Sequence, residues 1–303
     1  MTDERPAAAT AGRGHVELGP VGVWTSMPQW PADPGAIGAA GAELEELGFG
    51  AVWIGGSAGQ FAPAAALLAA TTRLVVATGV IEVWANPAQT VAAEHDRLTA
   101  AYPGRFLLGL GPGHAPAVEA RGQRYERPLA KLSSYLDELD SARPPVPAGE
   151  RVLAALGPRA LGLAGQRSAG AHPYNVTVEH TAIARAALGP GPLLAPEQKV
   201  YFSDDPADAR EVARQKIART LELPNYSNNL RRLGLDEQDF AGGGSDRLLD
   251  GLVAWGSPDK VAGRVRAHLD AGADHVCVQV LVGDGQSGLP LAEWRIAAAA
   301  LLG

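Results

Sequence analysis

Three glycines at alternate positions precede a histidine in the segment Tyr102–His114, which reads YPGRFLLGLGPGH. Glycine has no Cβ, so Gly109, Gly111 and Gly113 allow the backbone to approach a flat or anionic group closely. His114 follows them, and its imidazole titrates near neutral pH. This spacing is typical of the floor of a cofactor site. The same glycines would also suit a tight turn between a strand and a helix, where backbone geometry alone requires them.

The composition excludes several classes of protein. The chain has 303 residues and a formal net charge of −7 without a basic cluster, which argues against nucleic acid or an anionic membrane surface as partner. No apolar run approaches the length of a membrane span. Residues 1–17 are polar and alanine-rich without a signal pattern, so we expect a disordered tail on a cytoplasmic protein, with 18–303 as one domain.

Neither cysteine chemistry nor a metal site is indicated. The single cysteine, Cys277, lies in the apolar run His275–Leu281, which predicts a buried small side chain rather than a nucleophile. The seven histidines fall in no metal-ligand spacing, so we expect no metal.

Short apolar runs alternate eight times with longer amphipathic stretches, several of which open with proline. The predicted strands are Val21–Ser26, Ala51–Gly55, Leu74–Val80, Phe106–Leu110, Val152–Leu156, Ala171–Val176, Lys199–Ser203 and His275–Val282. Eight such units predict an α/β protein with the (β/α)8 fold of a TIM barrel, whose chemistry lies at the carboxyl ends of the strands. A doubly wound open sheet would require a G-x-G-x-x-G turn after the first strand, where this chain has Thr25–Trp30, TSMPQW.

The interval between the last two predicted strands is the longest in the chain. It carries helical patterning throughout, so we expect extra helices that form a lid or a subunit contact. The predicted helices are Pro206–Leu221, Tyr226–Leu233, Asp246–Ala254 and Pro258–Ala271.

Eight motifs occur in order over roughly residues 20 to 300. They are Ala77–Val80, Asn86–Glu94, Gly104–His114, Ala154–Leu161, Gly170–Tyr174, Leu194–Gln198, Trp255–Val261 and Ala271–Val276. In this order they resemble the luciferase-like monooxygenase family, and specifically its branch that uses the deazaflavin coenzyme F420. The resemblance implies a barrel that binds F420 or, as in the luciferase branch proper, FMN.

The resemblance also implies a non-prolyl cis peptide at Gly79–Val80, which in the family bulges against the back of the cofactor ring. The alternative is an ordinary trans strand end, with glycine required for packing. The three alternating glycines would then lie beside the same ring, and Tyr174 would cover it.

The phosphate tail of such a cofactor needs hydrogen-bond donors. Thr177 has the sequence context of a helix N-cap, whose helix offers free backbone N–H groups to an anion, while His180 and Arg185 could add charge. Thr177 could equally be a plain cap, and a solvated helix face suits Arg185 better than a ligand contact.

The chain departs from the family where alcohol dehydrogenases of this branch carry an Asp-His pair. Gly56 and Ser57 stand there, and neither takes a proton at neutral pH, so alcohol oxidation does not carry over. His114 falls where those enzymes carry a glutamate and could donate a proton to a developing carbanion. It could also only shape the pocket.

Aromatic residues near strand ends predict an apolar substrate pocket. Trp24 and Trp84 would line it together with Ser57, while Met27 and Trp30 lie in the first loop. Core packing is the alternative for each tryptophan.

These features together predict an oxidoreductase that moves a hydride between the deazaflavin C5 and a small organic substrate, best as reduction of a C=C or C=N bond by reduced F420. The alternatives are an FMN-dependent monooxygenase and a carrier that binds flavin or deazaflavin without turnover. The expected partners are a small-molecule substrate and a second copy in a homodimer, with neither nucleic acid nor membrane.

Overall fold

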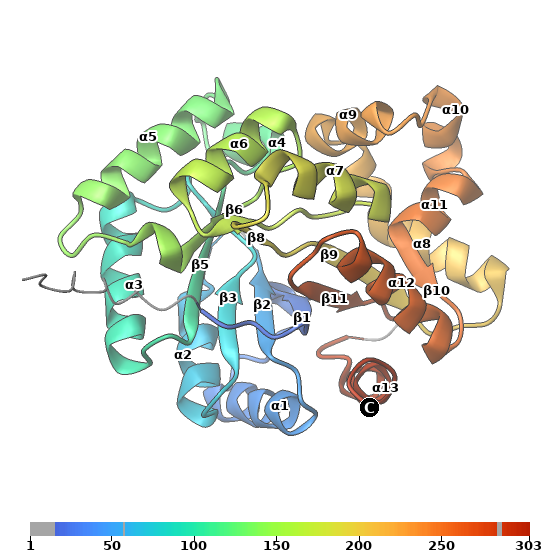
Figure 1. The fold of residues 1–303 in the computed structure, drawn as a ribbon, viewed down its shortest axis with the longest axis horizontal. Coiled ribbons are helices and arrows are strands. Elements are labelled where there is room, and N and C mark those ends of the chain that lie inside the picture. Colours follow the sequence, from blue (N-terminus) through green and yellow to red (C-terminus); the bar gives the residue numbers. More distant parts are fainter. Residues whose placement is uncertain (1–15, 57, 284–286) are drawn as a thin grey trace, which may run out of the picture.

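A curled sheet of parallel strands forms the centre of the molecule, and helices surround it (Figure 1). The structure is a computed structural model that describes residues 16–56, 58–283 and 287–303. Nearly all of the predicted tail 1–17 therefore lies outside the described residues. Within them the strands are β1 Val21–Ser26, β2 Ala51–Gly55, β3 Val75–Thr78, β4 Ile81–Glu82, β5 Phe106–Gly111, β6 Arg151–Leu153, β7 Gly170–Ala171, β8 Leu193–Leu194, β9 Glu197–Tyr201, β10 Val253–Trp255 and β11 Val276–Val280.

The sheet curls because β8, at the end of one side of the sheet, and β9, on the other side, follow each other closely in the chain. β1 pairs with β2 on one side and with β11 on the other, and β11 pairs in turn with β9. From β2 the pairing runs through β3, β5, β6 and β7 to β8. Only Ala195 and Pro196 separate β8 from β9, and the Ala195 amide donates to Ala171 O at 2.9 Å while Pro196 O accepts from the Cys277 amide at 3.1 Å.

The predicted parallel α/β sheet is confirmed, although its strands are divided differently. The predicted strand Leu74–Val80 is shorter in the structure, where β3 ends at Thr78 before the Gly79–Val80 peptide, and the short strand β4 follows it outside the predicted range. Strand β8 was not predicted, and Ala195 and Pro196 separate it from β9. The segment predicted as a helix over Asp246–Ala254 ends as a helix at Leu252, because Val253–Trp255 pairs with Lys199–Tyr201 as β10.

Helices cover the outer face of the sheet. They are α1 Pro34–Glu46, α2 Phe61–Ala70, α3 Ala88–Ala101, α4 Ala115–Glu119, α5 Pro128–Ser141, α6 Pro158–Arg167, α7 Val178–Leu188, α8 Pro206–Leu221, α9 Pro224–Arg232, α10 Glu237–Phe240, α11 Asp246–Leu252, α12 Pro258–Asp270 and α13 Leu291–Leu301. Proline occupies the first turn of α1, α5, α6, α8 and α12, where its missing N–H costs no hydrogen bond. Helices α8 to α11 gather beside β9 and β10, at the upper right of Figure 1.

Alternation along the strands creates two apolar layers. Val23 and Val52 face outward into the core between sheet and helices, whereas Trp24, Trp53 and Cys277 face into the curl of the sheet. None of the described helices is both long and apolar enough to cross a membrane. Across the described residues, no three or more His, Cys, Asp and Glu side chains gather in a way that could hold a metal ion.

Candidate active site at the carboxyl ends of the strands

Four rings from distant parts of the chain meet at the carboxyl ends of the strands. The Trp24 ring of β1 lies 5.1 Å from Tyr174, which follows β7, and Tyr174 lies 6.0 Å from Tyr226 of α9. Tyr226 in turn lies 5.5 Å from His114, which follows β5. In a parallel barrel this end carries the chemistry, so we take the cluster as the candidate active site.

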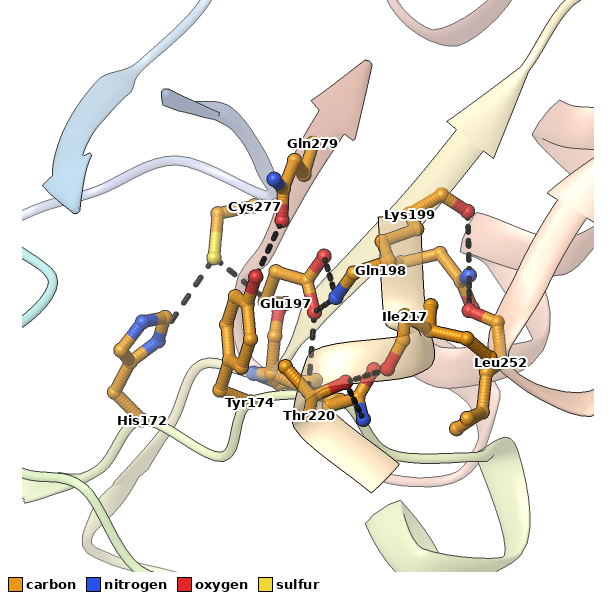
Figure 2. A network of polar contacts seen from close by, with 12 residues as sticks. His172, Tyr174, Glu197, Gln198, Lys199, Ile217, Thr220, Leu252, Cys277 and Gln279 are labelled. Carbon is orange, nitrogen blue, oxygen red and sulfur yellow. Dashed lines mark hydrogen bonds and ion pairs between the residues drawn. The ribbon is translucent and has the colours of Figure 1, made fainter. Parts of the chain in front are cut away.

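A buried ion pair supports Tyr174 from one side (Figure 2). Lys199 Nζ lies 3.2 and 3.1 Å from the two carboxylate oxygens of Glu197 and 4.0 Å from the centroid of the Tyr174 ring. The Tyr174 hydroxyl donates to Gln279 Oε1 at 2.9 Å, and the Asn175 amide donates to Glu197 Oε2 at 3.1 Å. A hydrogen bond to Gln279 of β11 and the cation of Lys199 of β9 therefore orient the Tyr174 ring.

Burial sets the protonation states around this cluster. It raises the pKa values of the Tyr174 and Tyr226 phenols, so both keep their protons at neutral pH. Burial also raises the pKa of Glu197, against the opposing effects of Lys199 and of the Asn175 amide. For His114 burial lowers the pKa below 6.5, and a hydrogen bond with Asn225 partly opposes the shift. The sequence predicted that His114 titrates near neutral pH, whereas in the structure its pKa is shifted toward acid pH.

A histidine, a tryptophan and the cysteine lie one layer deeper. The His172 ring stacks on Trp53 at 4.2 Å between centroids, and its Nδ1 lies 2.7 Å from Ala195 O. Burial lowers the pKa of His172 to about 4, so the ring is neutral at pH 7. The thiol of Cys277 lies 3.8 Å from His172 Nδ1, and burial raises the pKa of Cys277, which confirms that this cysteine is a buried side chain.

The peptide between Gly79 and Val80 is cis, as predicted. The Gly79 amide donates to Ile54 O at 2.8 Å, and the buried Gln60 side chain donates to Val80 O at 3.2 Å. Strand β2 and the start of α2 thus hold both sides of this bend.

The alternating glycines in β5 and just after it face the bend and its neighbours. A Cβ added to them would lie 1.9 Å from Thr78 O at Gly109, 2.7 Å from Val80 Cγ2 at Gly111 and 2.4 Å from Glu82 Cγ at Gly113. Gly113 also has a φ of +64°, which favours glycine. Close packing of β5 against β3 and β4 therefore requires all three glycines, and their contact with a cofactor stays a prediction.

The amino ends of α6 and α7 carry hydrogen-bonding groups without protein partners. Thr177 caps α7, accepting from the His180 amide at 3.4 Å, and His180 Nε2 lies 2.9 Å from Leu156 O. Among the described residues, His180 Nδ1 is buried without a partner, and Gly157 caps α6 without a side-chain bond. Free backbone donors of two helices thus point to this region.

Helix α9 adds positive charge at the same place. A Cβ on Gly157 would lie 3.5 Å from Arg232 Nη2, which also donates to Asn229 Oδ1 at 3.1 Å. Asn229 is buried, and its Nδ2 has no partner within the described part of the chain. A cation, two helix amino ends and an unpaired donor are suited to binding an anion such as a phosphate.

Several predicted residues lie elsewhere. Trp84 packs in the outer layer, 5.9 Å from the Tyr125 ring and 5.8 Å from Lys131 Nζ, so no ring contact joins it to Trp24. Trp30 also belongs to the outer layer. Arg185 binds Asp274 and the Gly272 carbonyl, which removes it from the anion-binding region. Ser57 lies outside the described residues.

The sequence interpretation missed Glu197, Lys199, Tyr226, Asn229 and Arg232. A signal existed for the first two, since they stand two apart in an apolar strand and must share a face. No local signal distinguishes the three α9 residues, because their meeting depends on where that helix packs.

Comparison with known proteins finds a family model that matches part of the chain, and one curated relative. Residues 14–143 match the model of the luciferase-like monooxygenase family. A curated relative, the 5,10-methylenetetrahydromethanopterin reductase of Methanolobus tindarius, is 25% identical over 300 residues, covering 81% of this chain and 90% of the relative.

Solved structures share the fold at low identity. An F420-dependent secondary alcohol dehydrogenase, solved with an F420-acetone adduct, superposes with a TM-score of 0.70 at 15% identity, covering 94% of this chain and 99% of that one. The oxygenating constituent of 3,6-diketocamphane monooxygenase from the CAM plasmid of Pseudomonas putida, solved with FMN, gives 0.65 at 14% identity, with 94% and 97% covered.

Proposed function

We propose that this chain, whose residues 14–143 match the model of the luciferase-like monooxygenase family, is an F420-dependent oxidoreductase that acts on a small organic substrate. The observation that supports this proposal most is that a ring-lined site at the strand ends occurs together with an anion-binding region at the amino ends of α6 and α7. A cofactor with a flat ring and a phosphate tail needs both. The curated relative named as a methylenetetrahydromethanopterin reductase supports the reductase reading.

The unpaired groups of the chain fit the phosphate of such a coenzyme. His180 adds no donor, because its Nε2 faces Leu156 O and burial lowers its pKa, so that its Nδ1 is an acceptor. Asn229 Nδ2 is a buried donor without a partner in the described chain, and the Arg232 guanidinium binds Oδ1 of the same side chain. Together with the N–H groups beyond Thr177 and Gly157, these groups would hold the tail.

The ring would be held at the cluster of Trp24, Tyr174 and Tyr226, against the bend at Gly79–Val80. The coenzyme supplies the carbon that accepts or donates hydride, so the protein supplies orientation, exclusion of water and a proton. The Glu197–Lys199 pair keeps Tyr174 fixed. His114, with its hydrogen bond to Asn225, is the proposed proton donor to the substrate.

We favour reduction of a C=C or C=N bond over oxidation of an alcohol. At the end of β2 the described residues Gly55, Gly56 and Ala58 carry no titratable group that could take a hydroxyl proton. Simple secondary alcohols such as 2-propanol should therefore not be oxidised at an ordinary enzymatic rate. Such oxidation would overturn the proposed direction.

Cofactor identity is tested by calorimetry with F420 and FMN side by side. We expect F420 to bind at least about tenfold more tightly, which corresponds to about 1.4 kcal/mol. Equal or tighter FMN binding would favour a flavin monooxygenase, because the anion-binding region suits either phosphate. Tight F420 binding without hydride transfer to any acceptor would favour a carrier.

A further inference from the structure

Two buried nitrogen atoms converge beside Gly79 without bonding to protein. Trp24 is 8% exposed and His172 is 1% exposed, yet the indole Nε1 and the imidazole Nε2 have no hydrogen-bond partner in the described residues. The position that a Cβ would take on Gly79 lies 2.7 Å from Trp24 Nε1 and 3.3 Å from His172 Nε2. Both nitrogens therefore lie within reach of one bridging atom next to a residue without a side chain.

The hydrogen-bonding roles of the two nitrogens are opposite. An indole N–H only donates. The His172 Nδ1 faces Ala195 O, which only accepts, so Nδ1 carries the proton. Because burial keeps His172 neutral at pH 7, its Nε2 is a bare acceptor.

Leaving both groups unpaired in a buried site would forfeit the hydrogen bonds that each makes with water in the unfolded chain. We propose that Trp24 and His172 form a binding site for one hydroxyl oxygen, which accepts a hydrogen bond from Trp24 Nε1 and donates one to His172 Nε2. The hydroxyl belongs to a water molecule or to an alcohol or enol group of a ligand. A carbonyl oxygen would satisfy Trp24 alone, and an ammonium group would satisfy His172 alone.

The site lies just below the candidate active site. The Trp24 ring contacts the half-buried Tyr174, while His172 contacts Trp53 and Cys277 in the deeper layer. A ligand that enters between the rings would meet Trp24 first. The site therefore gives the ring cluster a polar end that selects a hydroxyl group, and it does not depend on the identity of the cofactor.

A crystal structure of the whole chain without cofactor tests the free protein. We expect an ordered oxygen at about 3.2 Å or less from both nitrogens. A direct contact between Trp24 Nε1 and His172 Nε2, or empty density between them, would argue against the water form of the site.

Solution NMR tests ligand hydroxyls with two probes of similar shape. In protein labelled with ¹⁵N-tryptophan, the Trp24 indole signal is assigned by its loss in Trp24→Phe. We expect 2-propanol to shift this signal at concentrations at least about fivefold lower than acetone does, since only the alcohol can donate to His172. The substitution His172→Phe, which retains a ring on Trp53, should abolish the preference.

The matched control is Trp84→Phe, which removes another buried indole without a partner and should leave the preference intact. Urea unfolding confirms that each variant is folded. If the crystal structure shows an ordered water, and the Trp24 signal responds to neither probe or equally to both, the site binds water only. No ordered oxygen together with equal responses would overturn the proposal. Since no cofactor is used, these outcomes are separate from any failure of the proposed function.

Discussion

Glu197 and Lys199 form an ion pair that is almost completely shielded from water. Their side chains are 1% and 2% exposed, and both point into the curl of the sheet from β9. Taking two charges out of water is expensive, so such a pair is a poor source of net stability but is costly to break. Because Lys199 lies over the Tyr174 ring, the pair orients that ring.

Removal of one partner should show this asymmetry. We expect Lys199→Met to lower the free energy of unfolding by about 3 to 5 kcal/mol, because Glu197 is left as an unpaired buried charge. The double variant Glu197→Gln, Lys199→Met should recover much of the loss. Urea unfolding measures both, and a single variant as stable as the original protein would contradict the buried pair.

His114 is the proposed proton donor, and its removal separates chemistry from binding. We expect His114→Ala to lower kcat about a hundredfold, the usual size of a general-acid contribution, with little change in coenzyme affinity. Steady-state kinetics and calorimetry check the two quantities. Unchanged turnover would leave solvent or the substrate as the proton source.

The lowered pKa of His114 also gives turnover a pH dependence. The donor form is lost as pH rises through a value below 6.5, so kcat should fall with increasing pH and this dependence should vanish in His114→Ala. The hydrogen bond with Asn225 raises the pKa of His114, and Asn225→Ala should therefore move the fall to lower pH. A profile that Asn225→Ala leaves unmoved would exclude His114 as the titrating group.

Helix α9 brings together the two ends of the candidate site. Its first turn carries Tyr226 to the ring cluster, and its last two turns carry Asn229 and Arg232 to the amino ends of α6 and α7. Adjacent arginines in this helix have different surroundings, because Arg231 binds Glu237 and lies over Phe240. Substitution of Arg232 therefore tests the anion-binding region, and the same substitution of Arg231 is its control.

We expect Arg232→Ala to weaken F420 binding about tenfold or more, since a charge-assisted bond to phosphate contributes about 1.5 to 3 kcal/mol. Arg231→Ala should have almost no effect. Calorimetry at two salt concentrations checks the result, and the salt dependence should shrink only in Arg232→Ala. Equal effects of the two substitutions would remove Arg232 from the tail site.

The whole molecule should lose stability as the pH falls below 6.5. His172, His268 and His275 are buried, and burial lowers the pKa of each to about 4. The unfolded chain therefore binds more protons between pH 6.5 and 4, so the contribution of these residues is present above pH 6.5 and is lost on acidification. As the pH falls through that window, each histidine lowers the free energy of unfolding by about 1.4 kcal/mol per pH unit.

Urea midpoints at pH 7.5, 6.5 and 5.5 should therefore fall steeply over the last step. In His172→Phe, the slope of the unfolding free energy against pH should fall by the equivalent of about one bound proton. Glu45, whose pKa is lowered to about 2, titrates only at lower pH and does not explain a loss in this window. Equal midpoints at pH 7.5 and 5.5 would contradict the buried neutral histidines.

The sequence alone determined those features that depend on local pattern. Apolar runs separated by amphipathic stretches predicted the parallel α/β sheet, and Cys277 in such a run is buried. The resemblance predicted the cis peptide at Gly79–Val80 and the family that residues 14–143 match. These features follow from periodicity and short motifs, which a single chain displays directly.

Only the tertiary structure decided which side chains meet. Strand periodicity shows that Glu197 and Lys199 share a face, but the pairing of β9 with β11 and the course of the chain after β7 place them against Tyr174. The packing of α9 beside His114 is equally invisible in the sequence, because the contact joins residues more than a hundred positions apart. Burial then lowered the pKa of His114, an effect set by all the atoms that exclude water from the ring.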